Sequence, residues 1–178
     1  MVSRFRTLLA PAAVALLSCS ALPAADEPTV YEYILADLEG KETTLAPFRG
    51  KVLVVEFFAT WCPPCRKDLP QIAALQETFP VEKVAFVAVS ADGTTDTVGN
   101  LPAFLKEADL KIPVLVGGSL FVDRFAGVDK QGGRQVVLPQ TYVFDGNGEL
   151  VMRLVGEQKS KKKTLAGELE KLTKGEAS

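Results

Sequence analysis

The chain carries two cysteines, Cys62 and Cys65, shortly after a mostly apolar run and at a sequence that suits the start of a helix. The run Val52–Phe58, apolar except at Glu56, has the length and hydrophobicity of a buried strand. Pro63 and Pro64 between the cysteines suit a first helical turn, where a missing backbone N–H leaves no hydrogen bond unmade. The sequence therefore places two thiols where a buried strand ends and a helix begins.

This position favours thiol chemistry. Unpaired backbone N–H groups and the partial positive charge of a helix N-terminus stabilise a thiolate, and they lower a cysteine pKa from about 8.5 to roughly 3.5–7.5. Cys62 at the start of the helix is the expected nucleophile, and Cys65, one turn further in, is the expected resolving thiol. Such a pair attacks a disulfide, forms a mixed disulfide and releases the reduced product as Cys62 and Cys65 join. The sequence predicts a redox-active dithiol.

Two structural roles for the pair are alternatives. A zinc site needs four ligands, but the chain has no histidine and one further cysteine, Cys19. An inert disulfide is common outside the cytosol, but this one would close a short loop and contribute little stability. We expect no metal and no bound cofactor, because the two sulfurs carry the electrons.

The N-terminus has the pattern of an export signal. Arg4 and Arg6 precede the apolar stretch Thr7–Leu17, which is too short to span a bilayer. The residues before Cys19 resemble the lipobox of bacterial lipoproteins, with an aliphatic residue three positions earlier and a serine directly before the cysteine. We expect lipidation at Cys19 and a location on the periplasmic side of a bacterial membrane. A conventionally cleaved, soluble periplasmic or secreted protein is the alternative.

The expected organisation is a lipoprotein-type signal peptide at residues 1–18, a tether at residues 19–29 and one globular domain at residues 30–175. The formal net charge is −2, and loss of the leader makes it more negative, so the chain offers nucleic acid no general attraction. The lysine-rich stretch Lys159–Lys163 is expected to be the solvated start of a helix, because charge runs are usually exposed.

Hydrophobic periodicity and turn signals predict alternating strands and helices around a mixed sheet, an α/β sandwich. The expected strands are Glu32–Leu38, Lys41–Leu45, Val52–Phe58, Val84–Val89, Pro113–Val116, Thr141–Asp145 and Glu149–Val155. The expected helices are Pro63–Phe79, Leu101–Ala108, Leu120–Phe125 and Lys161–Lys174.

The segment Gly50–Cys65 closely resembles the active-site strand and turn of the thioredoxin superfamily, and most of all its membrane-associated ResA, TlpA and CcmG branch. The resemblance extends over Tyr31–Leu172. It implies a thioredoxin fold, with a central mixed sheet flanked by helices, an N-terminal β-hairpin and an insertion after the second core strand.

The resemblance implies that two residues lie where a substrate strand binds. Pro139 matches the superfamily's cis-proline, and the backbone of Leu138 before it would pair with the bound substrate; a trans proline entering an edge strand is the alternative. Gln140 stands where the family usually has a small hydroxyl residue. Trp61 is expected to shield the sulfurs and to offer substrate an apolar platform. The loop Gly127–Val136 is a candidate for partner selection or a plain solvated connection.

Two acidic residues are also carried over. Glu56 matches the buried acid of thioredoxins, although many members of the ResA branch have asparagine there. A carboxyl group in an apolar setting has a raised pKa, so Glu56 would take the proton from Cys65 as that thiol attacks the mixed disulfide; a solvent-reaching glutamate is the alternative. Asp68 matches the acid that ResA-like reductases place near their thiols, or is a helix-surface aspartate.

The resemblance implies an extracytoplasmic thiol-disulfide oxidoreductase that reduces protein disulfides, such as those of apocytochrome c or of a copper-site assembly protein. A membrane thiol carrier of the DsbD or CcdA type would supply the electrons. A disulfide oxidase or isomerase is the closest alternative, although DsbA-type oxidants usually have histidine between the cysteines. A peroxiredoxin-like peroxidase would have Pro and Thr where this chain has Val55 and Ala59, and a Sco-type copper chaperone would need a histidine.

Overall fold

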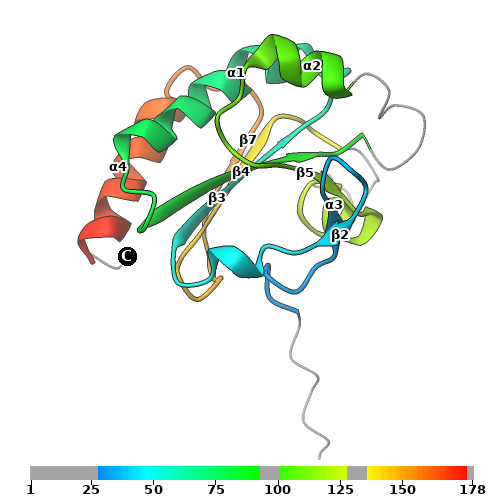
Figure 1. Ribbon diagram of the computed structural model, residues 1–178. Helices are drawn as coiled ribbons and strands as arrows, with labels where there is room; N and C mark the ends of the chain where they lie inside the picture. The colour runs from blue at the N-terminus through cyan, green and yellow to red at the C-terminus, as the bar shows by residue number, and fades with distance from the viewer. Residues whose placement is uncertain (1–27, 93–100, 128–135, 176–178) are drawn as a thin grey trace, which may run out of the picture.

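A seven-stranded mixed sheet is the centre of the computed structural model, which describes residues 28–92, 101–127 and 136–175 (Figure 1). The strand order is β2-β1-β5-β4-β3-β6-β7. The strands are β1 (Leu35–Ala36), β2 (Glu42–Thr43), β3 (Val52–Phe58), β4 (Val84–Ser90), β5 (Val114–Gly117), β6 (Gln140–Phe144) and β7 (Leu150–Val155). The helices are η1 (Ala46–Phe48), α1 (Pro63–Ala73), η2 (Ala74–Thr78), α2 (Leu101–Ala108), α3 (Ser119–Phe125) and α4 (Lys161–Lys174). The expected α/β thioredoxin fold is confirmed.

β3 lies inside the sheet, parallel to β4 on one side and antiparallel to β6 on the other. All seven of its residues are buried, which explains why its sequence is apolar without alternation. Successive side chains still point to opposite faces of the sheet. Leu53, Val55 and Phe57 enter one core, while Val54 and Phe58 enter the other. Glu56 belongs by this alternation to the second of these faces.

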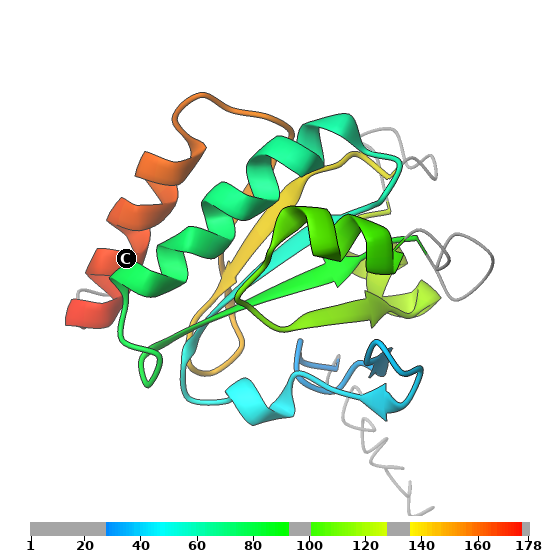
Figure 2. The ribbon, with the colours of Figure 1, turned by 45° about the horizontal axis from the view of Figure 1, so that its top comes forward.

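Two helical layers cover the sheet. α1, α2 and α4 pack on one face, where their apolar side chains share a core with Val54 and Phe58 (Figure 2). α3 covers the opposite face, where Phe121 and Val122 join the core that contains Leu53, Val55 and Phe57. The arrangement gives every residue of β3 a packed neighbour on its own side of the sheet.

The insertion expected after the second core strand supplies α2 and β5. β5 is parallel to β4, and the β1–β2 hairpin extends the sheet beyond it. The hairpin strands are shorter than predicted because a turn begins at Asp37, whose carboxylate accepts hydrogen bonds from the backbone N–H groups of Glu39 and Lys41. Gly40 within this turn has φ 82°, a value that favours glycine.

The first helix departs from the prediction at its end. α1 continues past Pro70 and stops at Ala73, and the 3₁₀ helix η2 begins at Ala74. The prediction of a single α-helix up to Phe79 was therefore wrong. The side chain of Gln76 in η2 donates to the carbonyl oxygen of Val84 and accepts from the N–H of Phe86. β5 pairs only with the later residues of β4, so Gln76 satisfies backbone groups that no strand reaches.

The predicted signal peptide, Cys19 and most of the tether lie outside the described residues, as does most of the loop Gly127–Val136. No helix in the part of the chain that the structure describes is long and apolar enough to cross a bilayer.

Candidate active site

Cys62 and Cys65 form a disulfide, with an S–S distance of 2.10 Å, at the start of α1. Cys62 is the N-cap residue of the helix, in an extended conformation that turns the chain from β3 into α1. The N–H of Cys65 donates to the Cys62 sulfur over 3.3 Å. Pro63 and Pro64 occupy the positions between them and have no N–H to donate. The dithiol therefore stands at a helix N-terminus, as predicted.

The turn before the dithiol is held by Asp92, which follows the end of β4. The Asp92 carboxylate accepts from the backbone N–H of Thr60 at 3.0 and 3.1 Å and from the Thr60 hydroxyl at 2.9 Å. It also accepts from the hydroxyl of Ser90 at 2.7 Å. These bonds fix the residue directly before Trp61, whose side chain is 57% exposed beside Cys62. Sequence analysis missed Asp92 because no local pattern links it to Thr60.

The peptide bond between Leu138 and Pro139 is cis, which confirms that expectation. β3 and β6 are antiparallel, with Phe57 opposite Gln140. The end of β3 and the start of β6 consequently meet at one edge of the sheet, and Pro139 lies at the same edge as the turn that carries Cys62. The carbonyl oxygen of Pro139 accepts from the N–H of Gly156 after β7.

Beneath the dithiol, a lysine joins the two predicted acids. Glu56 is 1% exposed, and one of its carboxylate oxygens accepts from the Lys161 ammonium at 2.9 Å. The other accepts from the hydroxyl of Thr141, which lies directly opposite on β6. Lys161 also forms an ion pair with Asp68, a buried residue of α1. Cys65 and Asp68 are three residues apart and both buried on this helix, so the cluster lies one turn from the resolving sulfur.

Burial raises the pKa of Glu56 from 4.5 to about 7. The positive charge of Lys161 opposes this rise, as do the hydrogen bonds from Thr141 and Lys161, while the charge of Asp68 adds to it. Glu56 therefore changes protonation near neutral pH, where a group that exchanges protons with thiols is most useful.

Lys161 corrects the expectation that Lys159–Lys163 is a solvated helix start. Its side chain is 1% exposed, whereas its neighbours Lys162 and Lys163 are exposed. A signal was available in the sequence. Lys161 lies four residues before Leu165 and eight before Leu169, so it belongs to the buried stripe of α4.

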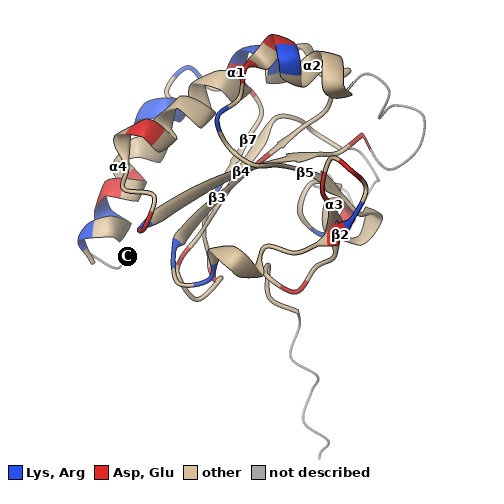
Figure 3. Cartoon of the chain, viewed as in Figure 1, with Lys and Arg blue, Asp and Glu red and all other residues tan. Residues whose placement is uncertain are grey.

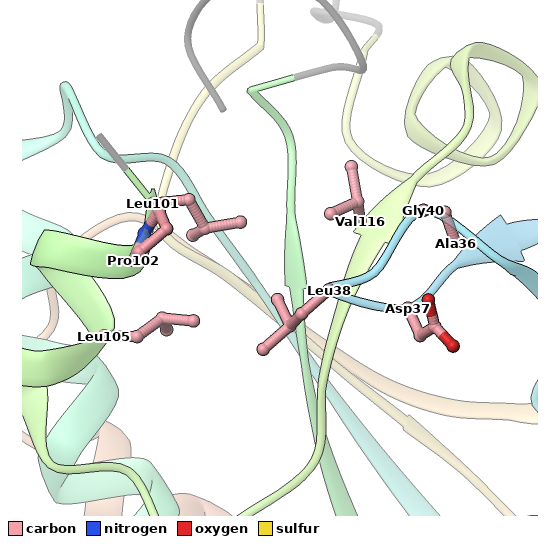
Figure 4. Close-up of a pocket in the computed structure, with 8 residues that line it drawn as sticks. All are labelled: Ala36, Asp37, Leu38, Gly40, Leu101, Pro102, Leu105 and Val116. Atoms are coloured by element: carbon pink, nitrogen blue, oxygen red, sulfur yellow. The ribbon is translucent and has the colours of Figure 1, made fainter. Parts of the chain in front are cut away.

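An apolar cavity in the described part of the chain lies away from this site. It measures about 280 Å³ between α2 and the β1–β2 hairpin, and Leu38, Leu101, Leu105 and Val116 line it (Figure 4). None of the predicted site residues lines it. Figure 3 shows basic and acidic residues interspersed along α1, α2 and α4. No cluster of three or more potential metal ligands occurs among the residues described.

This geometry defines a class: the thiol-disulfide oxidoreductases of the thioredoxin fold. The chain belongs to the AhpC/TSA family, whose model matches residues 28–153. It is 33% identical, over 141 residues, to a thiol-disulfide oxidoreductase ResA of Bacillus cereus, a match that covers 79% of this chain and 75% of the relative. The Cys62–Cys65 disulfide is accordingly the active-site disulfide of a ResA-like oxidoreductase.

Solved structures share the fold. A putative thiol:disulfide interchange protein DsbE from Chlorobium tepidum superposes with a TM-score of 0.67 at 23% identity, covering 82% of this chain and 95% of that one. The exposed lipoprotein thioredoxin Etrx1 of Streptococcus pneumoniae strain TIGR4 gives 0.57 at 24% identity, covering 79% and 98%. The agreement extends over most of the length of each structure, so the likeness concerns the fold as a whole and not one segment of it.

Proposed function

We propose that this oxidoreductase works as a reductase of protein disulfides outside the cytoplasm. Cys62 attacks the substrate disulfide and forms a mixed disulfide, and Cys65 attacks Cys62 to release the reduced product. Two electrons pass to the substrate and the Cys62–Cys65 disulfide forms. A membrane thiol carrier of the DsbD or CcdA type would then restore the dithiol. Apocytochrome c and copper-site assembly proteins are the proposed classes of substrate.

The observation that carries the reductase direction is the hydrogen bonding of Cys62. A helix N-cap side chain normally accepts from the N–H of the second or third helical residue. Pro64 occupies the second position and has none, which leaves the single bond from Cys65. The chain also has no histidine to stabilise a thiolate. A less stabilised thiolate makes the reduced form less stable, which makes it the better electron donor.

The reduction potential of the Cys62–Cys65 pair tests this proposal. Equilibration against glutathione or dithiothreitol buffers, followed through the single tryptophan Trp61, is expected to give a value near or below about −270 mV, the potential of thioredoxin. A value near about −120 mV, that of a strong oxidant, would contradict the reductase direction and favour the oxidase or isomerase.

The proposed location rests on the N-terminal sequence. The lipobox-like residues before Cys19 support lipid attachment, and a soluble periplasmic or secreted form is the alternative. Etrx1, which shares the fold, is itself described as an exposed lipoprotein. A lipid anchor would hold the dithiol close to a membrane carrier and raise its effective concentration there.

Peroxidase activity, which proteins of a related fold carry out, is not proposed. Val55 and Ala59 stand at the positions where a peroxidase carries its Pro and Thr, and both are buried. Neither side chain can donate a hydrogen bond to a peroxide. Cys62 instead forms a disulfide with Cys65, the arrangement that thiol-disulfide exchange uses.

We propose that Glu56 accepts the proton of Cys65 during resolution. Because the pKa of Glu56 is about 7, the carboxylate form accumulates as pH rises through neutrality. The rate of product release should therefore rise through this range in the wild type. In E56Q the rise is expected to disappear, with release about 10²-fold slower above neutral pH, the lower end of the range typical of a lost general base. Single-turnover kinetics across the pH range measures this.

The matched control is D68N, which removes the other carboxylate on Lys161 and leaves Glu56 in place. It is expected to retain the pH-dependent rise, shifted in pH because the charge of Asp68 no longer raises the pKa of Glu56. Identical profiles for E56Q and the wild type would remove Glu56 from the mechanism.

A further inference from the structure

Gln140 directly follows the cis-proline and is 1% exposed. Its Nε2 donates to the carbonyl oxygen of Val137 at 2.6 Å and to that of Ala126, after the end of α3, at 3.1 Å. One buried amide therefore holds two backbone carbonyls that belong to different segments. Both hydrogen bonds lie on the face of the sheet that α3 covers, because the side chains of Gln140 and Tyr142 point to that side of β6.

The orientation of this amide is fixed by Arg153 on β7. The Gln140 Oε1 accepts from the Arg153 Nε at 3.1 Å and from its Nη2 at 2.8 Å. A guanidinium has no acceptor, so the oxygen of the amide must face it and the nitrogen must face the two carbonyls. The Arg153 guanidinium in turn lies over the ring of Tyr142, with its central carbon 5.3 Å from the ring centroid. The amide is braced from the strand beside it.

The bond to Val137 has a consequence for the residue that precedes the cis-proline. A peptide unit is planar and trans, so its C=O and N–H point in opposite directions. The Val137 carbonyl and the Leu138 N–H belong to one such unit. Because Gln140 draws the carbonyl inward, the Leu138 N–H is turned to the opposite side. Val137 itself is 42% exposed, so this segment lies at the surface.

We propose that Gln140 is a positioning residue for the backbone of an extended substrate chain. It fixes the orientation of the peptide unit between Val137 and Leu138. The Leu138 N–H is therefore already oriented to donate to a substrate backbone before the substrate binds. Preorganisation of this kind favours ligands with a backbone to pair, since less ordering is needed on binding. Gln140 would thus make the enzyme favour protein disulfides over small disulfides. The inference rests on the proposed function, because it concerns substrate binding at the same dithiol.

The test measures how fast each of two disulfide substrates oxidises the reduced protein. One is a synthetic peptide of about twelve residues with an oxidised Cys-Xaa-Xaa-Cys pair, long enough to lie as a strand. The other is oxidised glutathione, which offers little backbone to pair. Oxidation of the Cys62–Cys65 pair is followed by the fluorescence of Trp61, and the dependence on substrate concentration separates half-saturation from the limiting rate. Thermal melting is recorded for each variant.

Q140E keeps an acceptor for Arg153 but loses the amide donors. Its second-order rate constant with the peptide is expected to fall about tenfold, equivalent to about 1.4 kcal/mol. The loss should lie in the half-saturation concentration, and the rate with glutathione should be unchanged. R153M retains the amide donors of Gln140, and its rate constant with the peptide is expected to fall less than that of Q140E. If Q140E does not fold, Q140M carries the same expectation without adding a charge.

An unchanged peptide rate in a folded Gln140 variant would overturn the proposal, and so would an equal loss with glutathione, since that indicates a general disturbance of the dithiol. Failure of the proposed function has a different signature. A wild-type protein that is not oxidised by either disulfide is not a reductase. In that case the oxidised protein is mixed with the dithiol form of the peptide and, separately, with reduced glutathione. Thiol exchange in this direction passes through the same mixed disulfide. The rate with the peptide divided by the rate with glutathione, compared between wild type and Q140E, then tests the role of Gln140.

Discussion

Replacing Cys62 with serine is expected to abolish disulfide exchange, lowering the rate by at least about 10³-fold. A serine hydroxyl is not ionised near neutral pH and cannot attack a disulfide sulfur. Both cysteines are buried, but Cys62, the N-cap residue, is 4% exposed, whereas Cys65 lies one turn into α1 and is 0% exposed. Cys62 is therefore the sulfur that a substrate meets. Turnover of a peptide disulfide measures the loss.

The matched variant is C65S, which keeps the attacking thiol and removes the resolving one. It should accumulate mixed disulfides between Cys62 and the substrate, visible as a mass increase that a reducing agent reverses. The order of attack would be the reverse of the one proposed if C62S, and not C65S, trapped the substrate.

Replacing Lys161 with methionine is expected to destabilise the protein by about 3–5 kcal/mol, the usual cost of removing one partner from a buried ion pair. Two buried carboxylates, on Glu56 and Asp68, would lose their shared cation. The pKa of Glu56 would rise further, because the charge of Lys161 is the main effect that lowers it. Urea denaturation at neutral pH measures the change in the free energy of unfolding.

The stability loss of K161M should depend on pH. A carboxyl whose folded pKa lies above its unfolded value costs stability when it must ionise, and it costs nothing below the unfolded pKa, where both states are protonated. Relative to the wild type, the part of the K161M deficit that comes from Glu56 should therefore grow as pH rises above about 7, where the wild-type carboxyl ionises in the folded state and that of the variant does not. It should be absent below about pH 7, where Glu56 is protonated in both folded proteins. K162M, at the exposed neighbouring position, should lose little at any pH. A similar loss in both variants would show that Lys161 acts through helix propensity rather than through the acids.

The elements around the dithiol were predictable because their signals are local. The run Val52–Phe58 is apolar except at Glu56, and it forms β3 with the predicted bounds. The helices Leu101–Ala108 and Lys161–Lys174 were also confirmed with their predicted bounds. The hairpin strands were overestimated because alternation continues beyond Ala36, while pairing stops where the turn at Asp37 begins.

The site was predictable where the chemistry is written in sequence spacing. Cys62, Cys65 and the cis-proline Pro139 follow from motifs. The cation of the acidic cluster does not, since Lys161 meets Glu56 across 105 residues of chain and is one of several lysines in its run. The same holds for Gln140, whose position beside the cis-proline was evident but whose partners after α3 and on β7 depend on packing.

The position of Lys161 at the start of the last helix also has a meaning for synthesis. A chain emerges from the ribosome N-terminus first, and domains fold as their segments become available. Both cysteines and both acids are released long before α4, so a nascent chain holds Glu56 and Asp68 without their cation until the final helix arrives. The chain consequently acquires its finished proton chemistry last, and a protein truncated before α4 would carry the dithiol without the charge balance beneath it.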